Sequence, residues 1–350
     1  MSFFFKFIPK KFLGVDIGTS AIKIVELQRR GDRKKLENYG EVKASVLYEK
    51  PFRTFEKSSL LLSSQDIARA IYAVIQEAKI KTKDCVFSIP DFSSFFTNFE
   101  LPQMTKEELP QAVNYEARQH IPMPLGEVTL DWQVVGGNLP IEQKEKLKIL
   151  LVAVPNEVIN QYQEIAQICQ LNLFGLEPEV FGLIRSLPPE DQKPAFCIID
   201  IGAQSTTCSI IERKVLKMSY SFDTAGNQLT EQIAKSLSVG YSEAEEMRKK
   251  YGLLPGGEKS IKDVLLPLVD VILREIERIS SGKNIQKFIL AGGASLIPGL
   301  KEYFQERLGK ETEISNPFAD IFYPPILEKT LKDMGPSYAI AIGMALRGLE

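Results

Sequence analysis

One motif occurs twice in this chain of 350 residues, and its repetition limits the possible folds more than any other feature. Each copy is an apolar run that ends in Asp-Ile-Gly, passes through small residues and returns into a second apolar run. The copies span residues 13–25 and 198–210. The pattern predicts a β-hairpin with a turn that glycine permits. Two such hairpins in corresponding contexts predict two similar halves with a shared cleft between them.

The residue types in the two turns are suited to phosphate. Gly18 and Gly202 have no Cβ, so the backbone can close on a phosphate group. The residues that follow offer N–H and hydroxyl donors to phosphate oxygens. We predict further phosphate contacts from Thr19, Ser20, Ala203, Gln204, Ser205 and Thr206. Either turn alone could be an ordinary hairpin turn, and the inference depends on the presence of both.

An aspartate precedes each glycine turn. Asp16 and Asp200 each end an apolar strand and are expected to face the shared cleft. Carboxylate oxygens suit Mg²⁺ and its waters, and two carboxylates beside a triphosphate would repel it without a metal. We therefore predict ATP with Mg²⁺ as the ligand, with Asp16 and Asp200 as metal-binding and catalytic residues.

A third element lies at residues 287–300, where an apolar run is followed by a Gly-Gly turn and a helix start near Pro298. Such a turn would let an adenine ring lie against bare backbone. The predicted contacts are Gly292, Gly293, Ala294 and Ser295. A plain strand-to-helix turn is the alternative interpretation.

Taken together, the motifs resemble those of the actin, Hsp70 and sugar kinase superfamily, in the family's order. Residues 16–18 resemble its first phosphate motif, 200–202 its second, and 291–295 its adenosine motif. Residues 176–178 resemble its first connecting motif, and 339–345 its closing helix. The resemblance implies an α/β actin-like ATPase fold, with two ribonuclease H-like lobes around a nucleotide cleft.

A closer resemblance is to the PilM family of type IV pilus assembly proteins, which are relatives of the division protein FtsA. It depends on residues 14–18 with 22–27, on 120–125 and on 177–179; Met123 replaces the family's usual aromatic residue. The resemblance implies a cytoplasmic ATP-binding scaffold that changes conformation with nucleotide and serves twitching motility. The implied partner is the N-terminal cytoplasmic peptide of the inner-membrane protein PilN, together with other pilus assembly proteins.

The implied place of the peptide is a groove beside residues 84–154, the inserted subdomain typical of FtsA and PilM. Ile121, Pro122, Met123 and Pro124 are candidates for its wall, with core packing as the alternative. The expected domains are a lobe 1 core at 1–83, completed by 155–190 and 325–350; the inserted α/β subdomain at 84–154; a lobe 2 core at 191–225, completed by 284–324; and a helical insertion at 226–283.

Two further residues of lobe 1 have open interpretations. Glu177 matches the position of a carboxylate that could activate the attacking water, but it is also a charged residue in a turn before Pro178. Lys23 could reach a phosphate, but it could equally be the solvent side of an alternating strand.

Lobe 2 offers three more candidates. Gly226 would let the backbone approach the phosphates, or it could simply form a helix-entry turn. Glu245 and Arg248 lie one turn apart on a helix that resembles the family's ribose- and adenine-contacting helix. Ser242 and Glu245 also have the spacing of a capping box, which would explain Glu245 without a ligand.

Composition excludes several other classes of protein. The net charge is −2 and no long Lys/Arg cluster occurs, so we expect no nucleic-acid partner. The four cysteines form no C-x-x-C pair and are expected to be reduced core residues, and with His120 as the one histidine we expect no zinc site.

No apolar stretch reaches the ~20 residues that span a bilayer, so membrane association is expected only through partners, at the inner face of the cytoplasmic membrane. The Phe-rich segment 1–12 is either an arm packed on the first lobe or a weak membrane-surface contact. A proline-rich stretch at 188–194 is a predicted linker.

Two other functions remain open at this point. The chain could be a small-molecule phosphotransferase of the sugar or acetate kinase type, although no substrate motif is present. It could also be an actin-like filament protein, and a homo-oligomer is possible. ATP hydrolysis is expected to be slow if it occurs.

Overall fold

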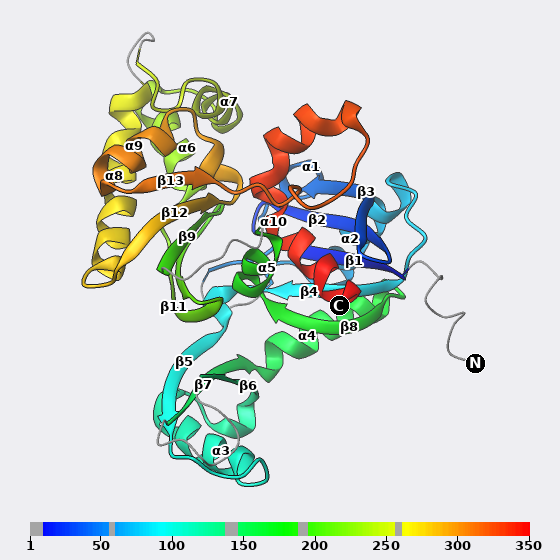
Figure 1. The fold of residues 1–350 in the computed structure, drawn as a ribbon. Coiled ribbons are helices and arrows are strands. Elements are labelled where there is room, and N and C mark those ends of the chain that lie inside the picture. Colours follow the sequence, from blue (N-terminus) through cyan, green and yellow to red (C-terminus); the bar gives the residue numbers. More distant parts are fainter. Residues whose placement is uncertain (1–9, 56–59, 137–145, 188–194, 256–260) are drawn as a thin grey trace.

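The computed structural model describes residues 10–55, 60–136, 146–187, 195–255 and 261–350, and contains two five-stranded sheets of the same design (Figure 1). The first sheet, in spatial order, has β3 (Arg33–Lys43), β2 (Ala21–Arg30), β1 (Lys10–Ile17), β4 (Asp84–Ile89) and β8 (Asn172–Pro178). The second has β11 (Val215–Phe222), β10 (Thr206–Glu212), β9 (Ala195–Ile201), β12 (Ile285–Ala291) and β13 (Glu311–Ile314).

The two sheets match strand for strand. In each, a three-stranded antiparallel meander lies beside two strands that join in parallel. The short repeat seen in the sequence is therefore part of a repeat of the whole sheet. The predicted α/β fold with two similar lobes is confirmed; lobe 1 denotes the first sheet with its helices, and lobe 2 the second.

Helices cover both faces of the lobe 1 sheet, because each helix buries its apolar side against the sheet. One face packs against α2 (Ser64–Glu77) and α4 (Asn156–Ile168), and the other against α5 (Glu179–Ser186) and α10 (Glu328–Leu349). A short helix, α1 (Ala44–Leu47), follows β3.

In lobe 2 the helices gather on the face away from lobe 1. A separate core joins the sheet to α6 (Gly226–Leu237), α7 (Tyr241–Tyr251), α8 (Ile261–Ser280) and α9 (Leu300–Leu308). Short 3₁₀ turns connect the elements at η3 (Asp91–Ser93), η4 (Leu125–Glu127), η5 (Gly293–Leu296) and η6 (Pro325–Leu327).

A third, smaller sheet forms the inserted subdomain, which projects from the body below lobe 1 in Figure 1. It consists of β5 (Phe95–Leu101), β7 (Leu147–Pro155) and β6 (Val128–Gly136), with α3 (Leu109–His120) packed on it. Its core is its own, formed by side chains of these four elements. A capping box precedes α3: Glu108 Oε2 accepts from the Thr105 amide at 2.8 Å, and the Glu108 amide donates to Thr105 Oγ1 at 3.3 Å.

The expected boundary of this subdomain at residue 84 is wrong. Residues 84–89 form β4, which pairs with β1 and β8 in the middle of the lobe 1 sheet. The apolar pattern of this segment predicts a buried strand, but a strand's pattern does not say which sheet receives it. The chain leaves lobe 1 only after β4 and returns at α4.

Two predicted features fall on residues that the structure does not describe: most of the N-terminal arm (1–9) and the linker at 188–194. Among the described residues, none of the helices combines the length and apolar character needed to cross a bilayer. The four cysteines are free, with three buried and Cys169 half-buried, as expected for reduced core residues.

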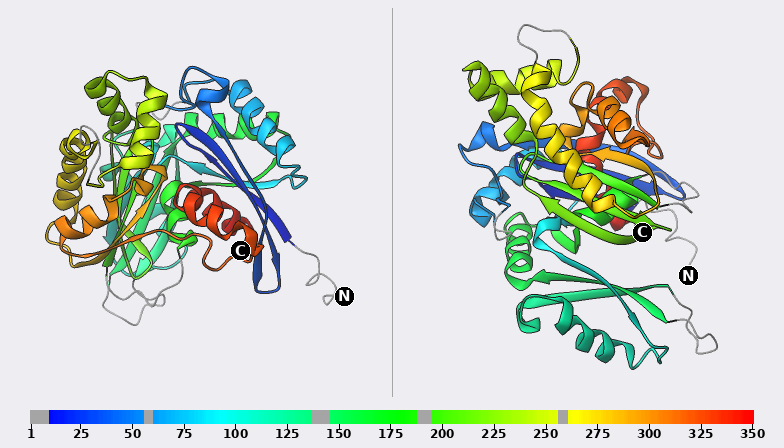
Figure 2. Two further views of the ribbon diagram at one scale, coloured as in Figure 1. Left: turned by 90° about the horizontal axis from the view of Figure 1, so that it is seen from above. Right: turned by 90° about the vertical axis from the view of Figure 1, so that its left-hand side faces the viewer.

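The long helix α10 lies between the two sheets and joins the lobes (Figure 2). Its backbone packs directly on its neighbours, because glycines remove the intervening side chains. A Cβ on Gly14 of β1 would lie 1.8 Å from the carbonyl oxygen of Ala341. A Cβ on Gly343 would lie 2.0 Å from the carbonyl oxygen of Gly182 in α5. Such contacts fix the position of α10 against lobe 1.

We predict that Gly343→Ala lowers the free energy of unfolding by at least about 1 kcal/mol. The added methyl group must displace backbone rather than a flexible side chain. Thermal melting measures the loss. Gly175→Ala in β8 is the matched control, since a Cβ there meets nothing within 4 Å. Equal melting temperatures of the two variants would contradict the close packing of α10.

Candidate functional site: a cleft between the lobes

The two glycine turns have the same geometry. The Gly18 amide donates to the Ala21 carbonyl at 3.0 Å, and the Gly202 amide donates to the Ser205 carbonyl at 3.0 Å. A Cβ on either glycine would approach that same carbonyl oxygen, at 2.8 Å and 2.9 Å. The glycines are therefore required by the tightness of the turns themselves.

Both turns line one cavity of about 700 Å³ between the lobes. Most of the residues expected to bind nucleotide lie on its wall, although they come from elements far apart in the sequence. They are Asp16, Gly18, Thr19, Ser20, Lys23, Asp200, Gly202, Ala203, Ser205, Gly226, Glu245, Arg248, Gly292, Gly293 and Ala294.

The two aspartates are held differently. Asp16 is buried, and its Oδ1 accepts a hydrogen bond from Ser88 Oγ of β4 at 2.9 Å. Burial, together with the negative charges of Glu179 and Asp16, raises the pKa of Asp200 to about 7. Its ionised form is therefore disfavoured unless a cation comes close.

Two further glycines allow lobe 2 to close around Asp200. Gly292 has a φ of +81°, and a Cβ there would lie 2.3 Å from Asp200 Oδ1. Gly226 begins α6, where its amide donates to the Gly202 carbonyl at 3.1 Å. A Cβ on Gly226 would lie 2.8 Å from Nη1 of Arg248. The Gly-Gly turn and the start of α6 thus meet at the second hairpin.

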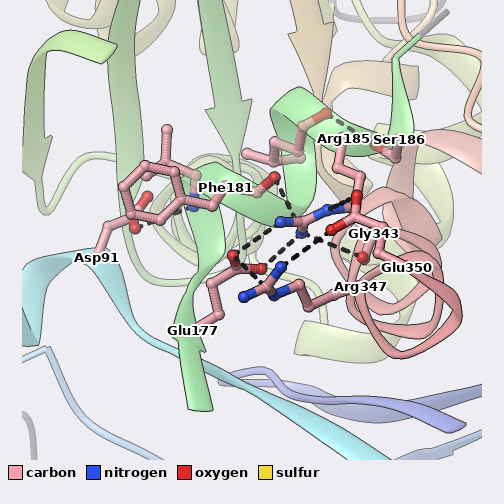
Figure 3. Close-up of polar contacts among 10 residues, drawn as sticks. Asp91, Glu177, Phe181, Arg185, Ser186, Gly343, Arg347 and Glu350 are labelled. Atoms are coloured by element: carbon pink, nitrogen blue, oxygen red, sulfur yellow. Dashed lines mark hydrogen bonds and ion pairs between the residues drawn. The ribbon is translucent and has the colours of Figure 1, made fainter. Parts of the chain in front are cut away.

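Glu177 does not face the cleft, which corrects its predicted role as the water-activating carboxylate. Arg185 of α5 binds it with both terminal nitrogens, Nη1 to Oε2 at 2.6 Å and Nη2 to Oε1 at 2.8 Å (Figure 3). Arg185 Nε also reaches Glu350 at 3.0 Å, and Arg347 of α10 lies 4.0 Å from Glu177. Glu177 lies within β8, and its side chain points toward α5 and α10. Its contacts with Arg185 and Arg347 link these two helices.

The carboxylate that reaches the cleft is Glu179, two residues further on. Pro178 turns the chain from β8 into α5, and Glu179 is the first helical residue. Its Oε1 forms a buried ion pair with Arg53 Nη2 at 2.5 Å. Burial raises the pKa of Glu179, although Arg53 opposes the shift. The sequence carried a signal for Glu179, since Glu-Pro-Glu offers two carboxylates, whereas Arg53 lies in no recognisable motif.

Three predicted contacts instead stabilise the turns and do not line the cavity. Thr206 Oγ1 donates to the Thr224 carbonyl at 2.7 Å, and Ser295 Oγ donates to the Gly292 carbonyl at 2.7 Å. The side-chain amide of Gln204 bridges to lobe 1, donating to the Arg53 carbonyl at 3.2 Å and accepting from the Phe55 amide at 3.1 Å.

Lys23 and Arg248 both reach the cleft. Lys23 is half-buried, with its Nζ 6.0 Å from the centre of the Tyr338 ring, and its side chain lines the cleft wall. Arg248 is buried, and its Nη1 donates to the Gly226 carbonyl at 3.2 Å. Tyr241 of α7, which the sequence analysis missed, also lines this end and donates to Asn227 Oδ1 at 3.0 Å.

Two lobes of one topology, each presenting an Asp-Ile-Gly turn to a common cleft, define a protein of the actin-like fold. Solved structures agree. A chain of the PilM-PilN type IV pilus biogenesis complex matches with a TM-score of 0.81 and 25% identity, covering 97% of this chain and 98% of that one. MreB5 of Spiroplasma citri bound to AMPPNP matches with a TM-score of 0.53 and 13% identity, over 96% and 95% of the two chains, a likeness of fold alone.

Residues 14–349 match the family model of the type IV pilus assembly protein PilM, and the chain belongs to this family. It is also similar to the cell division protein FtsA of Staphylococcus epidermidis, with 21% identity over 193 residues. That alignment covers 48% of this chain and 42% of FtsA, so the chain spans less than half the length of this relative.

The raised pKa of Asp200 predicts that Asp200→Asn changes stability in a pH-dependent way. In the folded protein this carboxyl keeps its proton up to about pH 7, whereas in an unfolded chain it ionises near pH 4. Between these values the folded state binds more protons, so the wild-type free energy of unfolding falls as pH rises, and levels off above about pH 7. Asparagine does not titrate, so the variant should gain stability relative to wild type from pH 4 to 8.

Thermal melting without nucleotide measures this gain. Asp32→Asn, in the exposed turn between β2 and β3, is the matched control for the loss of one carboxyl group. A difference between Asp200→Asn and wild type that stays constant with pH would contradict the assignment.

Proposed function

We propose that the cleft binds ATP with Mg²⁺ and that the chain is an ATP-binding scaffold of the type IV pilus assembly machinery. The observation that carries the proposal is the meeting of two equivalent glycine turns, one from each lobe, at a single cavity. Backbone amides from both turns can then bind one chain of phosphates, and binding would hold the lobes in one relative position.

Magnesium fits the residues present. Among the described residues no group of three or more His, Cys, Asp or Glu side chains could hold a metal by itself. The crowded carboxyl groups of Asp16 and Asp200 nevertheless favour a cation beside them, and phosphate oxygens and water would complete its ligands. Asp16 and Asp200 would hold the metal, which would supply positive charge, and the glycine turns would hold the phosphates.

The proposed partner is the N-terminal cytoplasmic peptide of PilN, which would hold this protein at the inner face of the cytoplasmic membrane. A solved structure similar along nearly the whole chain is a PilM-PilN complex. A second cavity, of about 590 Å³, lies where the inserted subdomain meets both lobes. Its wall includes Gln133, Val135, Phe181, Ile184 and Lys214. Apolar side chains beside polar ones suit a short peptide.

Other candidates for the groove wall do not line this cavity. Ile121 is buried in the separate core of the inserted subdomain, and Met123 packs against that core. The positions of these two residues favour core packing over a place in the groove wall. We place the peptide instead between β6 of the subdomain, α5 of lobe 1 and the β10–β11 turn of lobe 2.

We predict that Asp16→Ala weakens Mg-ATP binding by about tenfold or more, since charge-assisted contacts contribute roughly 1.5–3 kcal/mol each. Isothermal titration calorimetry measures the affinity, and thermal melting checks that the variant folds. Asp32→Ala, at an exposed position, is the matched control. Nucleotide affinity equal to that of wild type would refute the assignment of the cleft.

We predict that Gln133→Trp blocks the peptide by filling the second cavity from an exposed position on β6. The affinity for a fluorescent PilN N-terminal peptide, measured by anisotropy, should fall about tenfold or more. Gln119→Trp, exposed on α3 of the same subdomain and not part of the cavity wall, is the matched control and should bind normally. Undiminished binding by Gln133→Trp would place the peptide elsewhere.

A further inference from the structure

The side chain of Arg53 at the cleft floor is incompletely paired. Arg53 lines the cleft but is only 6% exposed. One guanidinium nitrogen, Nη2, pairs with Glu179, whereas Nε and Nη1 are buried without a hydrogen-bond partner. Buried donors of a charged group are costly to leave unpaired, and an arginine fork suits phosphate oxygens. The two unpaired nitrogens therefore suit an anionic ligand.

The surroundings of Arg53 favour a phosphate that arrives with its own cation. The negative charges of Glu179 and Asp16 act on this region, Asp200 adds another when a cation favours its ionised form, and Lys23 adds a positive charge from β2. A bare phosphate would be repelled by these carboxyl groups. Arg53 supplies an attractive contact within an otherwise acidic floor.

Arg53 also touches the turn that carries the inserted subdomain. Its guanidinium lies 5.3 Å from the centre of the Phe92 ring, in η3, which connects β4 to β5. The Glu179 carboxylate that pairs with Arg53 accepts from the Asp91 amide at 3.3 Å, and Asp91 Oδ1 accepts from the Val180 amide at 3.1 Å. Contacts thus run without a break from the cleft floor to the root of β5.

Lobe 2 contacts the Arg53 segment and strand β5. The Gln204 side chain, in the second glycine turn, donates to the Arg53 carbonyl and accepts from the Phe55 amide. Asn98 of β5 donates to the carbonyls of Leu216 and Lys217 in β11, at 3.2 Å and 3.1 Å. A change in the angle between the lobes would therefore pull on the subdomain from two sides.

We propose that Arg53 binds the terminal phosphate of the nucleotide through Nε and Nη1 and, through Glu179 and Phe92, couples the occupied cleft to the position of the inserted subdomain. The inference rests on the proposed nucleotide function and adds to it the residue that distinguishes a triphosphate from a diphosphate. ATP engages Nε and Nη1; ADP leaves the guanidinium with only its contacts to Glu179, Phe92 and the buried Tyr162 side chain. The subdomain also lines the proposed peptide cavity, so the same contact would make peptide binding depend on the phosphate state.

The test uses the full chain and two variants. Arg53→Lys keeps the charge beside Glu179 but loses the forked donors. The double variant Arg53→Met with Glu179→Gln removes both buried charges together, which folded proteins tolerate better than removal of one partner. Affinities for Mg-ATP and Mg-ADP come from calorimetry. Hydrogen exchange of residues 91–101, with and without Mg-ATP, reports on the turn and β5.

Wild type should bind Mg-ATP about tenfold or more tightly than Mg-ADP, and both variants should bring this ratio close to one by weakening ATP alone. Mg-ATP should slow exchange at residues 91–101 in wild type and not in the variants. Phe92→Leu is the matched control, which should keep the ATP preference and lose the exchange response.

Nucleotide binding by wild type with an ATP preference that both variants retain would overturn the proposal. Binding by wild type without any such preference would overturn it as well. Failure of wild type to bind either nucleotide would instead refute the proposed function of the cleft.

Discussion

Three buried carboxyl groups, those of Asp16, Asp91 and Glu179, and the half-buried carboxyl group of Asp200 lie around Arg53, and this crowding of acidic groups governs the cleft. Burial and the charge of Glu179 raise the pKa of Asp91 well above its usual range, and Asp200 is shifted to about 7. Such a cluster destabilises an empty cleft and is relieved by a bound cation. The protein thus gives up stability in its free form at a site that the proposed metal–nucleotide pair would complete.

The two lobes are joined by a core that both sheets share with α10. α10 is held by backbone contact to lobe 1 through Gly14 and Gly343, and it contributes to one core with strands of both sheets. The inserted subdomain keeps a core of its own. It joins the body through η3, through the chain that passes from β7 into α4, and through contacts of β5 and β7 with α5 and β11. Rigid bodies joined in this way move by hinge rotation rather than by repacking. The proposed peptide cavity lies where three of these bodies meet.

The sequence predicted the lobes and most of the cleft wall because those features depend on local chemistry. A glycine turn needs glycine wherever it occurs, so Gly18 and Gly202 could be recognised without knowledge of the fold. Glu177 and Glu179 could not be told apart, because which of them faces the cleft depends on how Pro178 starts α5. The pairing of Arg53 with Glu179 and the place of β4 in the lobe 1 sheet depend on long-range packing. Such packing leaves no local pattern in the sequence.

The most direct measurement is a crystal structure of the full chain with Mg²⁺ and a non-hydrolysable ATP analogue. The two-turn cleft predicts that the phosphates accept hydrogen bonds from backbone amides of residues 19–20 and of residues 203–205 together, with the metal beside Asp16 and Asp200. A nucleotide bound to one lobe alone, with the other turn facing solvent, would contradict it.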